Sequence, residues 1–535
     1  MSVIDNIVIG AGPAAAAVVS ALVEDRRQSV TVLDVGTRLE RWRQELLDEA
    51  RIQPVALWPT STRRALSEQP KSVGAVLPEK RVYGSDFPFR DEGQLAGVEA
   101  EGGANPNLVS SAFGGFSNVW GAQVMPFTRP TIDRWPVSYA DMTAAYRDIL
   151  RLIPFAGVDD DLAELFPLLV APAPLPRLAP RTETILRRYE RSRHRIRPLG
   201  ITVGAARLAF DASRCTRCGL CMTGCPDGLI FSASHLLDSL IAHRSVRYQS
   251  RSLVLEVTED ATGASVRWKD LATGRLHERS ADRVFVAAGG IGSTRLLATL
   301  KSLEGKSLKL QEALQFVLPA LSIRSAGDPR QQAAFTLNQF NVALQLDEDG
   351  RDLPFIHFYP YNAAMLEAVP RVLRVRSLDP ALASLMARLT VGLGYLPSWA
   401  SPTVQLRIGA RRHDGELPEV TVRRDDFGDL PMLKATVSAL RRVAPWLDLW
   451  PMPGVRLGAA GKSYHFGGTL PMAEASDPRE LVADRLGRPR GIRRVHFVDG
   501  AVLPDIPATT FTLTVMANAR RIAVEAMKRE IEAAA

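Results

Sequence analysis

The clearest pattern of apolar and polar positions lies in the first 36 residues. A short, β-branched apolar run (residues 6–9) leads into the glycine-containing stretch GAGPAA (residues 10–15) and then into a small, apolar segment (residues 16–22). A second apolar run (residues 30–33) ends at Asp34. A strand, a tight turn, a helix and a second strand in this order predict a β–α–β unit of a parallel sheet.

Small residues in this unit indicate a nucleotide site at its turn. Gly10 permits the tight turn, and Gly12 lets backbone N–H groups approach phosphates without an intervening Cβ. The start of the helix offers partial positive charge to phosphate oxygens. Ala15 replaces the third glycine of a dinucleotide fingerprint, where only a small side chain is needed. We expect dinucleotide binding rather than an ordinary β-turn-α unit, through Gly10, Gly12, Pro13, Ala15, Asp34 and Gly36.

The remaining pattern predicts an α/β domain combined with an antiparallel β domain. Alternating positions predict strands between residues 246 and 288 and again, in several runs, between 300 and 455. Helical periodicity is expected at residues 39–50, 135–155, 382–393 and 512–531.

Composition narrows the class of protein. With 535 residues, of which 46% are hydrophobic, the chain can bury a large core in two or more domains. The net charge is +8, and arginines are concentrated between residues 174 and 198. No nucleic-acid recognition motif or interleaved aromatics accompany them, so we favour a solvated helix face over a docking surface. No stretch approaches the roughly 20 apolar residues of a membrane span, so a cytoplasmic protein is expected.

Residues 110–121 (SSAFGGFSNVWG) carry too little side-chain volume to form a core. Two glycines followed by a serine and a Trp-Gly pair indicate backbone pressed against a flat ligand. The candidate contacts are Gly114, Gly115, Ser117, Asn118 and Trp120.

This motif and three others resemble those of the glucose-methanol-choline (GMC) flavin oxidoreductases. The others are residues 287–296, 465–472 and 499–519, in the order that the family has them. The resemblance implies an FAD-binding Rossmann-like domain interleaved with an antiparallel substrate domain. Pyranose-oxidase-like members attach the flavin through a histidine where this chain has Val119, which implies non-covalent FAD. Further cofactor contacts are expected at Val254, Ala288, Gly289, Asp499, Gly500, Thr512 and Leu513.

The resemblance also implies which residues act on the substrate. Of the eight histidines, only His465 lies in a His-x-x-Gly-Thr-x-x-Met context, whose histidine faces the flavin in the family. Oxidation of an alcohol needs a base near its oxygen, because hydride leaves only as the alkoxide forms. Thr510 occupies the position of the family's second catalytic residue, usually His or Asn. A threonine can donate a hydrogen bond but cannot act as a base.

All four cysteines lie within eleven residues, which indicates a site rather than a disulfide scaffold. Cys215, Cys218, Cys221 and Cys225 follow the spacing Cys-x2-Cys-x2-Cys-x3-Cys-Pro of bacterial ferredoxins, which predicts a [4Fe–4S] cluster. Zinc and free thiols are the alternatives. In two-cluster ferredoxins the fourth cysteine of the run ligates the other cluster, so it is open whether Cys225 serves this one.

We therefore expect an FAD-binding domain (residues 1–155, 200–300 and 455–535) with an iron–sulfur segment (205–235), a basic linker (156–199) and a substrate domain (301–454). The expected function is oxidation of an alcohol, with a sugar or polyol as the family-based guess, and electron exit through the cluster to an external acceptor. An acidic carrier protein is one candidate acceptor. Two alternatives are an FAD and iron–sulfur reductase without an alcohol substrate, for which residues 290–292 would be an NAD(P) fingerprint, and a non-enzymatic scaffold that keeps FAD for stability.

Overall fold

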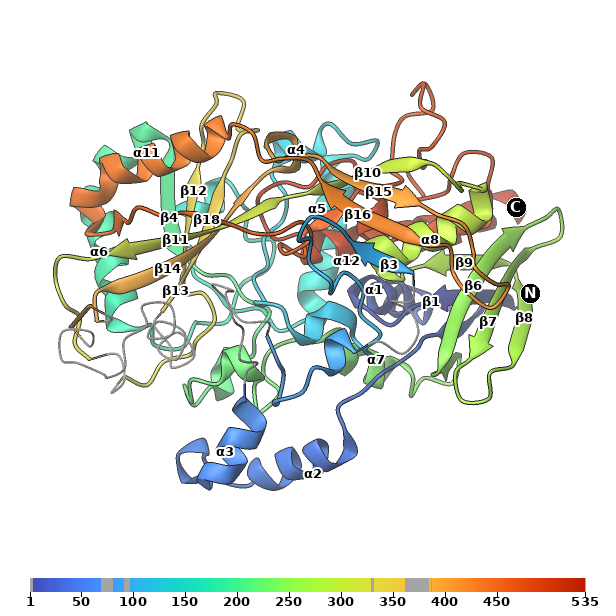
Figure 1. Ribbon diagram of the computed structural model, residues 1–535, viewed down its shortest axis with the longest axis horizontal. Coiled ribbons are helices and arrows are strands. Elements are labelled where there is room, and N and C mark those ends of the chain that lie inside the picture. Colours follow the sequence, from blue (N-terminus) through green and yellow to red (C-terminus); the bar gives the residue numbers. More distant parts are fainter. Residues whose placement is uncertain are drawn as a thin grey trace.

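The computed structural model describes residues 3–68, 80–90, 97–328, 332–360, 384–385 and 387–534, with side chains up to residue 528. A parallel sheet and a large antiparallel sheet lie toward opposite ends of the body, and two short helices project from one side of it (Figure 1). This combination confirms the expected α/β plus antiparallel β fold class.

The nucleotide-type domain is built on a five-stranded parallel sheet. Four of its strands are largely buried, since helices and a second sheet cover them, and the edge strand Val246–Gln249 is more exposed. Helix α1 (Pro13–Leu22) packs against α12 (Thr512–Ala534), which in turn packs against α5 (Tyr139–Leu152). In spatial order the strands are β20 (Val495–Phe497), β9 (Arg283–Val286), β1 (Ile4–Ile9), β2 (Gln28–Leu33) and β5 (Val246–Gln249).

A three-stranded antiparallel sheet adjoins this domain. Arg279, on its third strand, donates hydrogen bonds to Asp5 on β1 and Thr31 on β2, both at 2.8 Å. Helix α8 (Gly289–Lys301) packs against its first strand. The strands are β6 (Ser252–Glu259), β7 (Ala264–Asp270) and β8 (Leu276–Ala281).

The second domain contains a seven-stranded antiparallel sheet with its own hydrophobic core. Six strands follow one another and β18 (Arg456–Leu457) pairs with β11 beside them. In order they are β17 (Trp450–Pro451), β11 (Leu314–Leu321), β14 (Leu389–Leu396), β13 (Phe355–Tyr359), β12 (Phe340–Leu344) and β4 (Ile201–Ala205).

Two segments outside residues 301–454 pack with this sheet. Strand β4 pairs with β12, and helix α6 (Pro180–Ile196) contacts both β4 and α11 (Pro431–Leu447). Ile185, Tyr189 and Ile196 of α6 are buried in the core of the sheet. The stretch expected to be a basic linker therefore contains a helix with an apolar face, although the domain limits themselves stay a prediction.

The prediction of a helix at residues 382–393 is wrong for residues 389–393, which form a strand. Strand β14 begins at Leu389 and pairs with β11 and β13. A Cβ on Gly394 would lie 2.1 Å from the ring of Phe316 on β11, so the glycine makes room for a core aromatic across the sheet.

A mixed sheet, antiparallel except for one parallel pair at its end, connects the two domains. Its end strand β19 is formed by the residues directly after His465. The order is β19 (Phe466–Gly467), β10 (Ser307–Glu312), β15 (Val404–Ile408), β16 (Val420–Arg424) and β3 (Val98–Ala100).

Helices α2 (Arg41–Ala50) and α3 (Thr60–Ser67) form the projection in Figure 1, here named the α2–α3 lobe (residues 41–67). Its buried face includes Leu47, Trp58 and Leu66, and it packs on Cys218 and Leu220. The lobe therefore covers the segment that holds the four cysteines. The remaining helices are α4 (Arg129–Ile132) and α7 (Ala233–Leu240).

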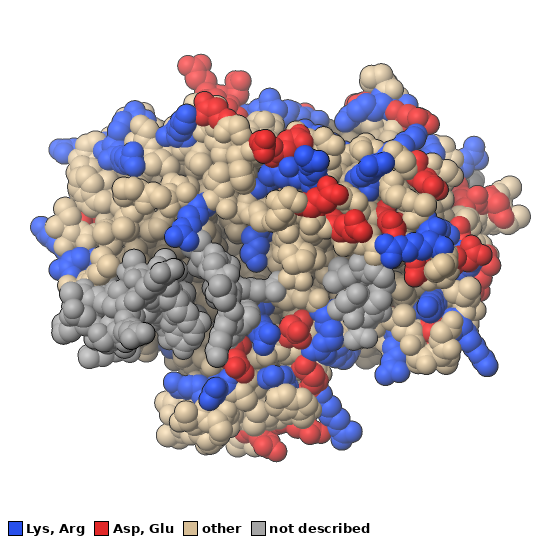
Figure 2. Space-filling model, viewed as in Figure 1, with Lys and Arg blue, Asp and Glu red and all other residues tan. Residues whose placement is uncertain are grey.

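On the face seen in Figure 2, the Lys and Arg of the described residues are interspersed with Asp and Glu. Several arginines of α6 and of the residues directly after it are engaged within the molecule. Arg188 donates to two backbone carbonyls, and Arg193 and Arg197 pair with acidic residues. None of the described helices combines the length and apolarity needed to cross a membrane.

Candidate active site and cysteine cluster

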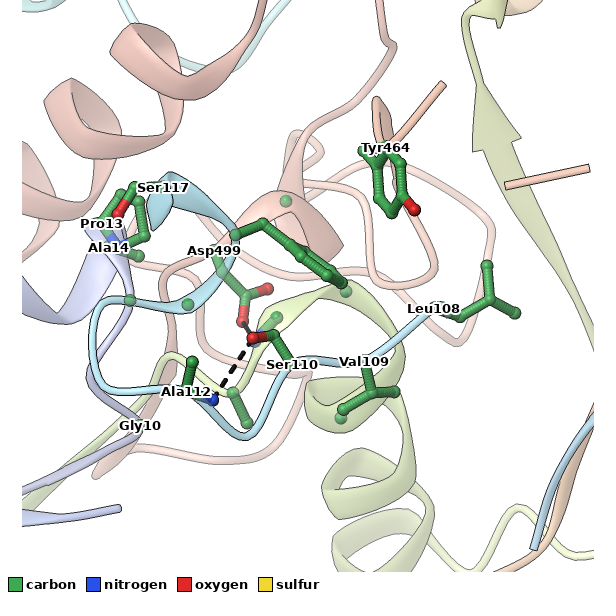
Figure 3. A pocket seen from close by; sticks show the side chains of 18 of the residues that line it. Gly10, Pro13, Ala14, Leu108, Val109, Ser110, Ala112, Ser117, Tyr464 and Asp499 are labelled. Carbon is green, nitrogen blue, oxygen red and sulfur yellow. Dashed lines mark hydrogen bonds between the residues drawn. The ribbon is translucent and has the colours of Figure 1, made fainter. Parts of the chain in front are cut away.

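One cavity of about 400 Å³ runs along the carboxyl ends of the parallel strands and reaches the antiparallel sheet. In Figure 3, Gly10, Pro13, Ala14 and Ser117 lie at one end of the view and Leu108 and Tyr464 at the other, with Asp499 between them. Ligands of open α/β sheets bind at this edge.

The nucleotide end of the cavity is formed by backbone. Gly10 has a φ of +98°, and a Cβ there would lie 2.5 Å from the carbonyl oxygen of Ala287 on the neighbouring strand. A Cβ on Gly12, by contrast, would meet no atom within 4 Å, and the same holds for Gly289. Both glycines line the cavity, so each leaves open space where a phosphate-bearing ligand can approach the main chain.

The second glycine motif lies directly on the first. Gly114 donates its N–H to the carbonyl of Ala11 at 2.9 Å, and a Cβ on Gly115 would lie 3.3 Å from the Cα of Gly12. Ser117, Val119 and Trp120 line the cavity beside them. Val119 offers no nucleophile for a covalent flavin bond, which agrees with non-covalent FAD.

Two carboxylates lie at this end. Asp34, at the end of β2, accepts a hydrogen bond from Tyr248 at 3.2 Å, and burial raises its pKa to about 7. Asp499 accepts from the N–H of Gly289 at 2.8 Å and from the hydroxyl of Ser293 at 2.5 Å. It thereby joins the C-terminal motif to the start of α8, and burial raises its pKa.

Most of the expected cofactor residues line this cavity, and five do not. The five that do not line it are Ala15, Gly36, Gly114, Asn118 and Leu513. Asn118, for example, donates hydrogen bonds to the carbonyls of Phe113 and Gly115 instead. The residues that line it are Gly10, Gly12, Pro13, Asp34, Gly115, Ser117, Trp120, Val254, Ala288, Gly289, Asp499, Gly500 and Thr512.

His465 lies at the other end, between the parallel and antiparallel sheets. Both polar groups of its backbone are hydrogen-bonded. The N–H donates to Ser463 Oγ at 3.1 Å, and the carbonyl accepts from Ala313 N at 3.0 Å. Its ring stacks on Tyr395 with centroids 4.7 Å apart. Nδ1 is buried without a hydrogen-bond partner, and burial lowers the pKa of His465 to about 4. The side chain is therefore a neutral imidazole near pH 7.

Thr510 is not brought to the cavity. Its hydroxyl donates to the backbone carbonyl of Gln123 at 2.9 Å, and only its neighbours Phe511 and Thr512 line the cavity. A hydroxyl has one proton to donate. That proton is committed to the main chain, and Thr510 is not among the residues that line the cavity.

Three side chains that line the cavity from the seven-stranded sheet were missed by sequence reasoning. Gln315 on β11, Tyr359 on β13 and Tyr395 on β14 all line the cavity. Gln315 donates to the Tyr395 hydroxyl at 3.2 Å, which leaves the tyrosine proton free for another acceptor. Burial raises the pKa of both tyrosines, so they stay protonated. Their strands read as ordinary apolar β segments, and no local signal marks them.

The cysteine segment (residues 211–228) forms a compact loop under the α2–α3 lobe. Positive φ angles at Arg217, Gly219 and Gly224 curl its backbone. The Sγ of Cys215 accepts from the N–H of Arg217 at 3.4 Å, and that of Cys221 from Thr336 N at 3.3 Å. Backbone N–H groups directed at cysteine sulfur are the environment that iron–sulfur clusters use.

The donor set fits a cluster better than a single ion. Burial raises the pKa of Cys215 to about 11 and that of Cys225 to about 12, so bound cations are needed to hold these groups as thiolates. No three His, Cys, Asp or Glu side chains in the described ranges are grouped closely enough for one metal ion. A zinc site needs its sulfurs about 4 Å apart, given Zn–S bonds of about 2.3 Å. A four-iron cube holds them farther apart.

Comparisons with known proteins agree with the description of the flavin-type cavity and with that of the cysteine segment. Residues 454–519 match the GMC oxidoreductase family model, and residues 208–230 match a 4Fe-4S binding domain. No curated protein matches the sequence significantly. Among solved structures, the fold is similar to that of pyridoxine 4-oxidase from Mesorbium loti, with a TM-score of 0.58, 13% sequence identity, and 98% of this chain and 99% of that chain covered.

The fold and the site define a flavin-dependent oxidoreductase. More particularly, residues 454–519 match the C-terminal domain of GMC oxidoreductases and residues 208–230 match a 4Fe-4S binding domain, so the cofactors are FAD and a 4Fe–4S cluster. The resemblance seen in the sequence motifs is thus confirmed.

Proposed function

We propose that the protein is a dehydrogenase that oxidises a CH–OH group to a carbonyl and releases the electrons to an external acceptor through its cluster. When bound, FAD supplies the hydride acceptor, and the cluster supplies a one-electron exit. The observation that carries the proposal is the position of His465 in the same cavity as the nucleotide motifs, at the end where the antiparallel sheet contributes its side chains.

In this proposal His465 is the general base. An imidazole that stays neutral down to about pH 4 is ready to take the alcohol proton at physiological pH. Its stacking on Tyr395 and contact with Phe511 hold the ring in one plane. The fixed backbone of His465 keeps that ring from moving as the substrate changes charge.

Tyr395 is proposed as the donor that orients the substrate oxygen. It is in ring contact with His465, and Gln315 already donates to its oxygen, which directs its own proton elsewhere. Tyr359 offers a second hydroxyl on the cavity wall. These side chains would replace the partner that the family usually has at the position of Thr510.

The lining near His465 favours an alcohol with an apolar or aromatic body over the sugar or polyol that the family resemblance suggested. The residues there are mainly aromatic, and the two cavity carboxylates, Asp34 and Asp499, belong to the nucleotide end. Recognition of several hydroxyls needs several convergent polar groups, whereas this end offers few. The similar fold of pyridoxine 4-oxidase, whose name specifies an aromatic alcohol, supports the same class.

The test is anaerobic bleaching of the bound flavin by a panel of aromatic alcohols, aliphatic alcohols and sugars. Bleaching by an alcohol, with aromatic alcohols effective at the lowest concentration, is the expected result. Bleaching by NAD(P)H alone would replace the proposal with the reductase alternative, and bleaching by neither would favour the scaffold. Oxygen uptake after bleaching should be slow compared with reoxidation by a one-electron protein acceptor such as an acidic ferredoxin.

Electron exit is tested by anaerobic iron and acid-labile sulfide analysis together with EPR after dithionite reduction. Four irons per chain and a reduced-cluster signal are expected. A Cys218→Ala variant should bleach with alcohol like the parent but lose transfer to the protein acceptor. Unchanged transfer in a variant shown to lack its cluster would reject this exit route and leave the alcohol chemistry standing.

A further inference from the structure

One short segment, residues 80–90, contributes to the walls of both cofactor sites. Lys80 and Phe89, at its two ends, line the flavin cavity. Between them, Tyr83 donates its N–H to the carbonyl of Thr223 and its hydroxyl to that of Cys225, both at 2.7 Å. The Tyr83 ring occupies the space beside Gly224, where a Cβ would lie 2.7 Å from it. Residues 80–90 therefore contact both the cavity and the cysteine segment.

The cysteine segment itself reaches the cavity. Met222, next to Cys221, is one of the residues that line it, together with Trp120. Trp120 is anchored by its indole N–H, which donates to the carbonyl of Phe231 at 2.7 Å. Lys80, Trp120 and Met222 thus belong to the part of the cavity wall that adjoins the cysteine segment, and we name these three residues the partition.

Lys80 is the cation of this partition. Its Nζ donates to the backbone carbonyl of Trp120 at 3.0 Å. Among the residues that the structure describes, no carboxylate contributes to the pKa of Lys80, and the one charge that would raise this pKa is a thiolate at Cys221. Burial lowers the pKa of Lys80 to about 8, so it remains mainly protonated at neutral pH.

A fixed positive charge at this point has an electrostatic consequence. A cluster held by four thiolates is negative, and reduction adds one more negative charge. The reduction potentials of such clusters depend on nearby charge and on solvent exposure. A charge enclosed by protein acts through a lower effective dielectric than a charge in water, so it favours the reduced state more strongly.

We propose that Lys80 controls electron exit: its ammonium, held on the Trp120 carbonyl between the two cofactor sites, raises the reduction potential of the cluster and draws electrons from the flavin to it. For each alcohol oxidised, two electrons cross the partition in succession and two molecules of a one-electron acceptor are reduced, while the protons pass to solvent. This role rests on the cofactors and the electron exit of the proposed function, and it is independent of the alcohol.

The test is an EPR-monitored redox titration of the holoprotein with dithionite and mediators, without substrate. Lys80→Met removes the charge and keeps the length of the side chain, whereas Lys80→Arg keeps the charge. We expect Lys80→Met to shift the flavin–cluster equilibrium at least about tenfold toward the flavin, which is about 59 mV for a one-electron couple. Lys80→Arg, which keeps the positive charge, should have a cluster potential close to that of the parent protein.

The matched control is Arg214→Met. Arg214 is an exposed cation that also acts electrostatically on a cysteine of the segment, Cys225, but it is paired with Asp211 in solvent. We expect a smaller shift that disappears at high salt, while the Lys80→Met shift persists because an enclosed charge is poorly screened.

An unchanged cluster potential in Lys80→Met, with full iron and sulfide content, would overturn the proposal. So would an equal shift in Arg214→Met, or a Lys80→Arg variant that behaves like Lys80→Met, since the lysine would then act through structure. If Lys80→Met does not retain its cluster, Lys80→Gln is titrated against Lys80→Arg with the same criteria. Because no alcohol enters this titration, failure of the alcohol assignment leaves its result unaffected.

Discussion

The two ends of the cavity are built in opposite ways. At the nucleotide end, main-chain groups of consecutive residues face the ligand, as in the turn from Gly10 to Pro13 and the start of α1. At the other end, side chains from separate strands converge: Gln315, Tyr359 and Tyr395 come from β11, β13 and β14.

This difference explains what each end can tolerate. A backbone site depends on the absence of side chains, so any Cβ in the wrong place abolishes it. A side-chain site loses only the one group that is removed, and its neighbours remain in position. Substitutions at the nucleotide end should therefore be more damaging than substitutions of similar size at the substrate end.

The largest effect is expected for Gly12→Val. Its side chain would project into open cavity beside the N-terminus of α1, where it displaces a phosphate without touching the protein. Loss of two or three charge-assisted hydrogen bonds should weaken FAD binding by about a thousandfold or more. FAD content and affinity measure this. Gly415→Val is the control, because its Cβ is equally unobstructed but lies outside the cavity. Stoichiometric FAD in Gly12→Val would contradict the nucleotide assignment.

His465→Ala should retain FAD but slow its reduction by alcohol by about 100-fold or more, the usual contribution of a general base. Stopped-flow reduction under anaerobic conditions gives the rate, and bound FAD is measured in the same sample. His413→Ala, at an exposed histidine, is the control and should reduce at the parent rate. An unaffected rate in His465→Ala would make that histidine structural.

A smaller effect should separate Tyr395 from Thr510. Tyr395→Phe removes a hydroxyl that faces the cavity, so we expect reduction about tenfold slower, which corresponds to one hydrogen bond. Thr510→Val removes a hydroxyl committed to Gln123, and its rate should stay within about twofold of the parent. The opposite ranking would return the second catalytic role to Thr510.

The smallest change is expected with pH. Because burial lowers the pKa of His465 to about 4, the neutral form that accepts a proton prevails above that pH. The rate of flavin reduction should therefore stay flat from pH 8 to pH 5 and fall below about pH 4. An exposed histidine, with a pKa near 6.5, would instead lose activity below pH 7. An acid limb near pH 6.5 would show that the base is not enclosed.

The sequence predicted the nucleotide end well because its signals are local. A glycine at a turn, a small residue on a helix and an acid at a strand end follow one another over a short stretch of sequence, as Gly10, Ala15 and Asp34 illustrate. The spacing of four cysteines is local in the same way. Motifs of this kind can be recognised before any tertiary structure is known.

The substrate end could not be predicted in that way. Tyr395 matters because the fold brings it against the ring of His465, about 70 residues further along the chain, and Tyr359 reaches the same cavity from the neighbouring strand. The helix expected at 382–393 failed for the same reason, since Gly392 and Gly394 are fixed by Phe358 and Phe316 across the sheet. Similarly, the basic stretch contains a buried helical face whose partner, β4, is recognised only in three dimensions.

The way the chain closes its parallel sheet has a consequence for biosynthesis. Strand β20 completes the sheet on β9, Asp499 fixes the start of α8, and Arg520 on α12 bonds to Ser20 and Glu24, about 500 residues earlier. The N-terminal β–α–β unit therefore leaves the ribosome long before its partners exist. At about 5–20 residues per second it waits tens of seconds with its apolar face uncovered. We therefore expect the emerging chain to need chaperones during translation, and the flavin site to be completed only after nearly all of the polypeptide has been made.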